Sequence, residues 1–327
     1  MMKLSDESFA LLLLCSHLGL PEIPDAKPLS TREWNKLEQA LEAHSLNLPA
    51  LAGLSVKQIK STLQTSDDEA SRISLLLNRG SAIQENLDRL NELGIWIITR
   101  LDEDYPRRFI ERLNAAAPVL LYGAGELRLL NRRGLAVVGS RNIDERGFAV
   151  TEFVGNACAE SKLTVYSGGA RGVDKTAMNA AMVAGGNAVG LLADSLEKGV
   201  RAADARGRIE EGQLALATSF SPHASFTIGM AMARNKLIYA LSDFALVIAS
   251  DAEKGGTWAG AEEALKAGWI PVFVVDGPNV PDGNRLLIKR GGIPFPDAFG
   301  DSPSSLGDWL EEHTPAKEPV ALQGSLF

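Results

Sequence analysis

From Gly134 onward the sequence alternates short apolar runs with longer helical segments, and this alternation constrains the fold more than any other feature. The apolar runs are "GLAVVGS", "LTVYSGG", "NAVGLLA", "FALVIAS" and "IPVFVV". Helical segments such as "GFAVTEFVGNACAES" and "TWAGAEEALKAG" separate them. Short strands that alternate with helices predict an α/β fold, in which a parallel sheet carries helices on both faces.

The first part of the chain has a different pattern and predicts a small all-helical domain. "STREWNKLEQALEAH" has apolar residues at helical spacing after a capping candidate, Ser30 or Thr31. Gly94 marks the end of the last helix, and a β-branched run follows it. The predicted organisation is a helical domain at 1–95, an α/β domain at 96–300, and a short helix with a loose tail at 301–327.

Composition excludes several classes of protein. The 327 residues carry a formal net charge of -8, so nucleic-acid binding would need a local basic patch. The two cysteines, Cys15 and Cys158, have no partner cluster of histidines, which argues against a disulfide framework or a metal site. The apolar run "FALLLLCSHLGL" is too short to span a membrane. We therefore expect a cytoplasmic protein that uses no metal and no membrane.

The first predicted strand-end turn is "VVGSRN", which contains Gly139, Ser140 and Arg141. Glycine lets the backbone approach a ligand, and arginine can make a forked contact with phosphate. The alternative is a plain turn with a solvated arginine. The longer stretch "RLLNRRGLAVVGSRNIDER" predicts a local basic patch beside the turn, with five arginines: Arg128, Arg132, Arg133, Arg141 and Arg146.

The second turn, "YSGGARGVDKTA", is the stronger signal. Its glycines allow successive N–H groups to point into one concavity at a helix N-terminus, a geometry that binds phosphate. It is not a Walker A loop, because no GK[ST] follows at the required spacing. The alternative is tight packing of strand on helix, with Asp174 only as a helix cap. The candidate residues are Ser167, Gly168, Gly169, Arg171, Gly172, Asp174 and Lys175.

Two later segments complete the predicted site. "MARNKLIYALSD" places Arg234, Asn235 and Lys236 at a helix start, from where they would close the site. "EKGGTWAGAEEAL" forms a third turn with Gly255, Gly256 and Thr257, the last a candidate for capping and for phosphate contact. Ligands of parallel sheets lie beyond the carboxyl ends of the strands, where these turns fall. The sequence thus predicts a cationic, Gly-rich phosphate site.

At these residues the chain resembles the DNA-processing protein A (DprA/Smf) family. "LDEDYPRRF" and "PVLLYGAG" are similar to the family's YP turn and P-x-x-L-Y-x-x-G segment. "VVGSRN", "YSGGARGVD" and "ARNKLIYALSD" then follow in the family's order, and the resemblance covers roughly residues 101–294.

The resemblance implies an extended Rossmann-like sheet that binds single-stranded DNA without chemical turnover. It also implies natural transformation, recombination, loading of a RecA-type recombinase, and a homodimer. Carried over motif by motif, the DNA contacts would be Gly139, Ser140, Arg141, Ser167, Gly168, Gly169, Arg171, Gly172, Asp174, Arg234, Asn235 and Lys236.

The chain departs from the family's pattern at three places: Met178 stands where the family usually has histidine, Lys236 replaces the second arginine, and "KGGTWAGAEEA" replaces S-G-x-x-x-T-A. The last segment also resembles the lysine-decarboxylase-like phosphoribohydrolases (the LOG family). That alternative implies hydrolysis of a nucleoside monophosphate by Arg234 with Glu262 or Glu263. A nucleotide-binding sensor without hydrolysis, for example in phage defence, is the related alternative.

The chain ends in "ALQGSLF", which resembles the peptide by which bacterial proteins bind the sliding clamp. Gln323, Leu326 and Phe327 match that motif, and Gly324 departs from it. A loose tail is a suitable carrier for such a peptide. The alternative is a chance match, because motifs this short recur often.

Overall fold

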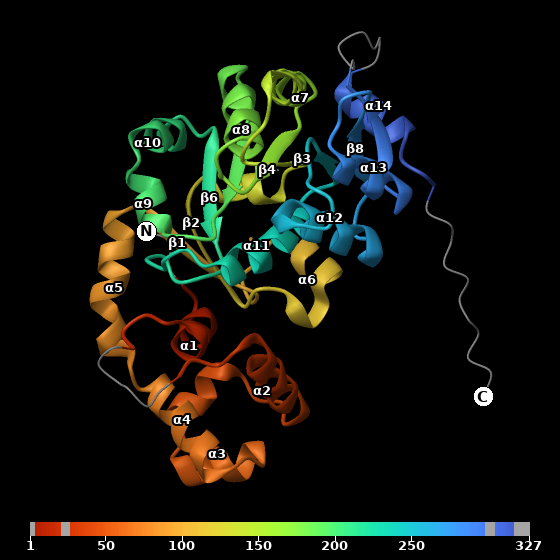
Figure 1. Ribbon diagram of the computed structural model, residues 1–327. Helices are drawn as coiled ribbons and strands as arrows, with labels where there is room; N and C mark the ends of the chain where they lie inside the picture. Colours follow the sequence, from red (N-terminus) through yellow and green to blue (C-terminus); the bar gives the residue numbers. More distant parts are fainter. Residues whose placement is uncertain (1–3, 21–26, 298–304, 317–327) are drawn as a thin grey trace, which may run out of the picture.

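The computed structural model describes residues 4–20, 27–297 and 305–316 (Figure 1). Gln323, Leu326 and Phe327, the predicted clamp-binding residues, lie outside this part. The described residues form a nine-stranded sheet in the order β1-β2-β6-β5-β4-β3-β7-β8-β9. The strands are β1 (Ile95–Thr99), β2 (Leu120–Gly125), β3 (Gly134–Val138), β4 (Thr164–Ser167), β5 (Ala188–Leu191), β6 (Leu214–Thr218), β7 (Phe244–Val247), β8 (Val272–Asp276) and β9 (Ile293–Pro296).

In this sheet order, the seven strands from β6 through β3 to β9 are parallel to one another. β2 pairs with β6 in the antiparallel direction. β1 pairs antiparallel with β2, with Ile95 opposite Ala124. From β3 the chain proceeds outward to β4, β5 and β6 and then returns to β7 on the other side of β3. The strand order therefore reverses between β3 and β7. A sheet of this type binds its ligand beside such a reversal, beyond the carboxyl ends of the strands.

Helices cover both faces of the sheet, as the sequence predicts. On β3, Leu135 and Val137 pack into the core beneath α7 and α8, whereas Ala136 and Val138 pack into the core beneath α6, α11 and α12. The helices of this part are α6 (Arg107–Leu113), α7 (Glu145–Glu160), α8 (Val173–Val183), α9 (Leu196–Arg201), α10 (Ala203–Glu210), α11 (Ile228–Leu241), α12 (Gly255–Ala267), α13 (Asp282–Lys289) and α14 (Leu306–Glu312). No helix of the described part is long and apolar enough to cross a membrane.

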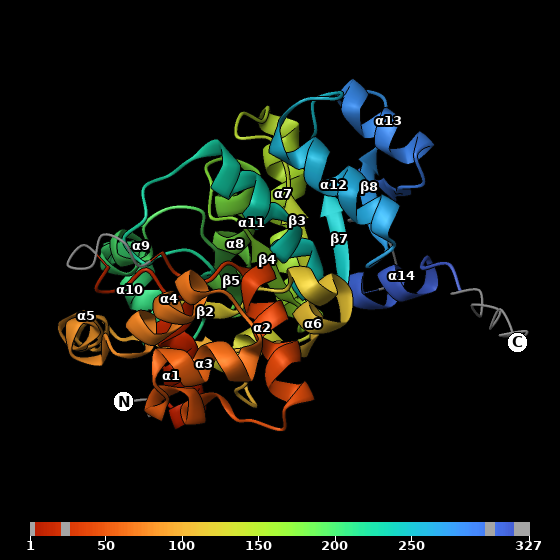
Figure 2. The same ribbon diagram turned by 90° about the horizontal axis from the view of Figure 1, so that it is seen from below.

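The N-terminal helices form a group below the sheet in Figure 1 and in front of it in Figure 2. They are α1 (Asp6–Cys15), α2 (Thr31–Ala43), α3 (Val56–Leu63), α4 (Asp67–Leu77) and α5 (Gly80–Glu92). The capping prediction is confirmed at Ser30, whose hydroxyl accepts from the N–H of Glu33 while the Glu33 carboxylate accepts from the N–H of Ser30. The sequence signal for this helix start was a capping box.

These helices share their hydrophobic core with the sheet. Leu11 and Leu14 of α1 belong to the same buried cluster as Ile97 and Tyr122 of the first two strands. The Ser8 hydroxyl lies 3.1 Å from that of Thr99. Residue 95 therefore marks a change from helices to strands, but the apolar core continues across it.

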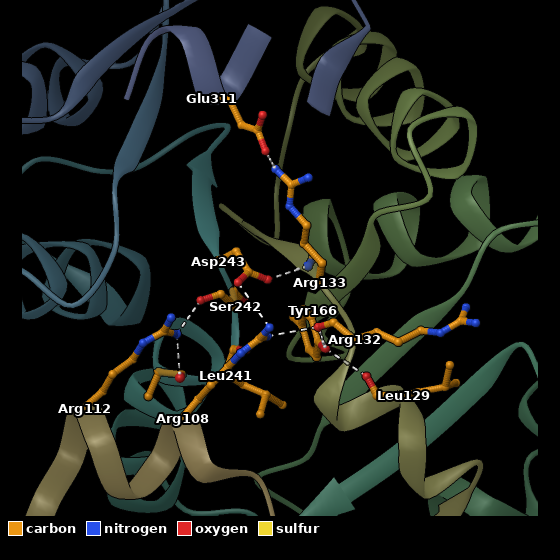
Figure 3. Close-up of polar contacts among 12 residues, drawn as sticks. Arg108, Arg112, Leu129, Arg132, Arg133, Tyr166, Leu241, Ser242, Asp243 and Glu311 are labelled. Carbon is orange, nitrogen blue, oxygen red and sulfur yellow. Dashed lines mark hydrogen bonds and ion pairs between the residues drawn. The ribbon is translucent and has the colours of Figure 1, made fainter. Parts of the chain in front are cut away.

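The C-terminal end of α11 is fixed by two arginines of α6 (Figure 3). Arg108 donates a 2.8 Å hydrogen bond to the Leu241 carbonyl, and Arg112 donates one of 2.8 Å to the Ala240 carbonyl. Arg108 also pairs with Asp243 at 3.1 Å. Cations at a helix C-terminus satisfy its last carbonyls and favour the negative end of its dipole. As a result α11 is anchored at the end remote from its N-terminal turns.

Candidate functional site

The three Gly-rich turns meet at one edge of the sheet, as predicted. They follow β3, β4 and β7, which are neighbours in the order β4-β3-β7. A cavity of about 610 Å³ opens there. Of the predicted residues, those that line it are Gly139, Ser140, Arg141, Asp174, Arg234, Asn235, Gly255, Gly256 and Thr257.

The first turn is tied to the strand beside it. The N–H of Ser140 donates to the Ala249 carbonyl at 2.9 Å, which connects the ends of β3 and β7. The Ser140 hydroxyl accepts from the N–H of Asn142 at 3.1 Å and so holds the turn closed. The exposed Arg141 guanidinium lies 5.7 Å from the centre of the Phe226 ring. The turn therefore presents a cation and an aromatic side chain together at the cavity.

The second turn differs from the prediction, because its concavity holds a carboxylate of the protein itself. Asp174 accepts hydrogen bonds from the N–H groups of Gly168 at 3.1 Å and Ala170 at 3.3 Å. The N-terminal cap of α8 is Gly172, so the expectation that Asp174 caps the helix is wrong. Since the carboxylate accepts from these two N–H groups, they do not point to a phosphate.

Arg234 lies beneath this turn and is only 6% exposed. Its Nη1 donates to the carbonyls of Gly168, at 2.6 Å, and of Leu191. Burial raises the pKa of Asp174, and the Arg234 charge counters that effect. Burial likewise lowers the pKa of Arg234, and Asp174 counters it. Arg234 and Asp174 thus compensate each other electrostatically and shape the cavity floor.

The third turn presents a helix N-terminus to the cavity. α12 begins at Gly255, and no side chain caps it. Thr257 is the third residue of this helix, so the expectation that it caps the helix is wrong. Asn235 holds the turn in place with a 2.9 Å hydrogen bond from its side-chain amide to the Gly256 carbonyl. An uncapped N-terminus carries partial positive charge and free N–H groups, which suit an anion.

Several predicted residues do not line the cavity. Ser167 is fully buried, and its hydroxyl donates to the Val137 carbonyl at 2.6 Å. Lys175 lies 3.9 Å from Asp204. Lys236 lines a second cavity on the other side of α11. The remaining four, none of which lines the main cavity, are Gly168, Gly169, Arg171 and Gly172.

The predicted arginine patch is divided between two edges of the sheet. β3 separates Arg132 and Arg133 from Arg141 by roughly 16 Å, because a strand rises about 3.3 Å per residue. Figure 3 shows Arg133 directed to Glu311 on α14, with which it forms an ion pair, and Arg132 directed elsewhere. The expectation of one basic patch beside the first turn is therefore wrong.

The arrangement does not supply the glutamate that a phosphoribohydrolase would need. Glu262 forms ion pairs with Arg290 and, at 3.3 Å, with Lys266. Neither Glu262 nor Glu263 is among the described residues that line the cavity. Met178, the departure from the usual histidine, is buried in the core.

Sequence reasoning missed an apolar element of the site. Phe226, Ile228 and Met232 line the cavity, yet they are 48%, 78% and 41% exposed. The signal for Phe226 and Ile228 was present in "SFTIGM", where these two large apolar residues flank Thr227, the N-cap of α11. Exposed apolar residues that gather at a polar cavity point to a ligand with an apolar surface.

Comparison with known proteins places this geometry in context. Residues 96–295 match the family described as DNA recombination-mediator protein A. The DNA processing protein DprA of Streptococcus pneumoniae is 31% identical over 196 residues, which cover 58% of this chain and 67% of that protein. Protein Smf of Escherichia coli K12 is 30% identical over 221 residues, which cover 65% of this chain and 57% of Smf.

Solved structures agree on the fold. The X-ray structure of DprA from Streptococcus pneumoniae matches with a TM-score of 0.66 and 22% identity, over 93% of this chain and 100% of that one. A structure of DNA processing protein A from Helicobacter pylori, which describes that protein's single-stranded DNA binding mode, matches with a TM-score of 0.50 and 23% identity. That match covers 61% of this chain and 90% of the other.

Proposed function

Since the chain belongs to the DNA recombination-mediator protein A (DprA/Smf) family, we propose that it binds single-stranded DNA in the cavity between its three Gly-rich turns. One observation carries the proposal: a cation, an uncapped helix N-terminus and an exposed aromatic ring line the same cavity. A single strand of DNA offers partners for all three, in its phosphates and its unstacked bases.

The phosphates would contact Arg141, Lys254 and the N-terminus of α12. Lys254 and Arg141 are exposed cations that line the cavity. Asp251 is the exposed acidic residue among the residues that line it. The buried Arg234 is compensated by Asp174 and contributes little net charge. The phosphate contacts thus come from the first and third turns, whereas the second turn supports them.

The bases would stack on the apolar side of the cavity. Phe226 provides an exposed aromatic face, and Ile228 and Met232 extend it along α11. Stacking of a base on an aromatic side chain contributes about 1–3 kcal/mol and tolerates any base. We therefore expect binding with little dependence on sequence.

Binding proceeds without chemical turnover in this proposal. The carboxylate of Asp174 accepts two backbone hydrogen bonds, and the glutamates of α12 lie elsewhere. Delivery of the strand to a RecA-type recombinase, self-association into a homodimer, a cytoplasmic location and clamp binding through Gln323, Leu326 and Phe327 belong to the same proposal. Deletion of residues 323–327 tests the clamp contact, which should be lost while DNA binding persists.

The test of the main proposal is fluorescence anisotropy with a labelled oligothymidylate over a series of salt concentrations. Arg141→Ala should weaken binding and lower the salt slope by about 0.7, the value for one phosphate contact on a single strand. Arg128→Ala removes another exposed arginine, which pairs with Glu126 outside the cavity, and this variant should match the wild type.

AMP is the competitor that separates the two classes of function. An excess of AMP should neither displace the oligonucleotide nor lose its base on incubation with the protein. Displacement of the oligonucleotide by AMP would refute the proposal in favour of a nucleotide site. So would release of adenine from AMP by a protein that binds no oligonucleotide.

A further inference from the structure

The helix α11 separates two cavities. A helix turns about 100° per residue, so Arg234 and Lys236 point in directions about 200° apart. Arg234, Asn235 and Ile238 face the main cavity. Ala233, Lys236 and Leu237 face a second cavity of about 210 Å³. The two cationic side chains of the "RNK" motif, Arg234 and Lys236, therefore line different cavities.

The second cavity lies between the N-terminal helices and the α/β part. Thr31 comes from the start of α2, Phe220 follows β6, and Lys236 comes from α11. Lys236 is the one charged side chain among the described residues that line it. It is half-buried and has no hydrogen bond or ion pair within the described residues. A half-buried cation without a counterion is ready to receive an anion.

An exposed strip crosses α11 from one cavity to the other. Ile228 and Met232 line the main cavity, and Ala233 lines the second. These three residues and Gly229 are all exposed, so an exposed surface of the helix runs from one cavity to the other. The strip is apolar throughout, so bases can pack on it while phosphates contact the cations on its two sides. A helix is about 10–12 Å across with its side chains, which a few nucleotides can span.

We infer that a single strand bound in the main cavity crosses the N-terminal turns of α11 and places its next phosphates in the second cavity, at Lys236. The start of α2 then forms part of the DNA footprint. This gives the N-terminal helices a direct role in binding. The inference rests on the proposed function, since it extends the same bound strand.

The test uses the full chain and oligothymidylates of about 4, 8, 12 and 16 nucleotides, a range that covers known single-strand footprints. Lys236→Ala should lower the affinity for the longer oligonucleotides about fivefold at 0.1 M salt, because log K changes by about 0.7 per phosphate contact for each tenfold change in salt. The shortest oligonucleotide, which fills only the main cavity, should bind equally well to both proteins.

Two further variants separate charge from structure. Lys236→Arg keeps the positive charge and should restore the affinity for long oligonucleotides. Lys266→Ala changes the net charge by the same amount at an exposed site of α12 and should match the wild type. Thr31→Glu places a carboxylate in the second cavity, at a helix start where an acid favours the fold, and should weaken only the longer oligonucleotides.

The outcomes distinguish this inference from the function on which it rests. If wild-type protein binds no oligonucleotide of any length, the proposed function fails. If wild-type protein binds but Lys236→Ala has no effect, or weakens all lengths equally, the crossing over α11 is wrong. An unchanged affinity of Thr31→Glu for long oligonucleotides would also overturn it, because the N-terminal wall would then lie outside the footprint.

Discussion

Gly172 belongs to the second turn and packs against the backbone of the first. Its replacement by alanine tests how closely the two turns must pack. Its backbone has φ 80° and ψ -131°, a region of backbone conformation that residues other than glycine rarely adopt. A Cβ atom at this position would lie 2.5 Å from the Ser140 carbonyl oxygen and 2.6 Å from that of Arg141. Both contacts are with backbone, so Gly172→Ala must either move the first turn or twist the start of α8.

Two contributions determine the size of the effect. The backbone region alone costs about 1–3 kcal/mol for a residue with a side chain. Forcing an additional methyl group into a packed site typically costs about 1–3 kcal/mol more. We therefore expect Gly172→Ala to lower the free energy of unfolding by about 2–6 kcal/mol.

Gly185 supplies a matched control at the opposite edge of the sheet. Its φ is 81°, but a Cβ atom there would meet nothing within 4 Å. Gly185→Ala should therefore lose only the backbone contribution, about 1–2 kcal/mol for a left-handed residue. The difference between the two variants isolates the contact between the turns.

The assays are urea unfolding for the free energy and anisotropy for DNA binding, under conditions in which both variants are folded. Gly172→Ala should bind single-stranded DNA at least about tenfold more weakly, a loss of about 1.4 kcal/mol, because the first turn carries Arg141. Gly185→Ala should bind like the wild type. Equal stabilities of the two variants, or wild-type DNA affinity in Gly172→Ala, would show that the packing of the turns does not set the site.

Two other predictions follow from single residues. Phe226→Ala should weaken DNA binding by about 1–3 kcal/mol through lost stacking, whereas Phe148→Ala, an equally exposed phenylalanine outside the cavity, should not change the anisotropy titration. The hydrogen bond from Arg72 lowers the pKa of Glu33 to about 2, so its stabilisation is present above pH 4.5 and is lost as the pH falls towards 2. Glu33→Gln should lower stability by about 1 kcal/mol at pH 7, and its unfolding curve should converge with that of the wild type in acid; a constant gap across this range would contradict the assignment.

The sheet and the position of the site could be predicted from the sequence because both depend on local pattern. Apolar runs that alternate with helices fix a parallel sheet, and its turns then meet at one edge. The β-branched run that follows Gly94 forms the first strand, Ile95–Thr99. The contacts within the site were harder, since glycines permit a concavity without specifying what fills it.

Asp174 illustrates that limit. Its position near a helix start is equally consistent with a cap, with a phosphate site, and with the observed contact to Gly168 and Ala170. Only the path of the backbone distinguishes these. By contrast, the separation of Arg234 from Lys236 follows from helix geometry and could have been predicted, as could the division of the arginine patch by β3.

The core shared by the N-terminal helices and the sheet bears on cooperativity. When one apolar cluster spans two regions of different topology, neither region can open without exposing the buried surface of the other. The two regions are then expected to melt in one transition rather than in two. A ligand that contacts both regions would raise the temperature of that single transition, and its binding free energy would protect both regions against proteolysis.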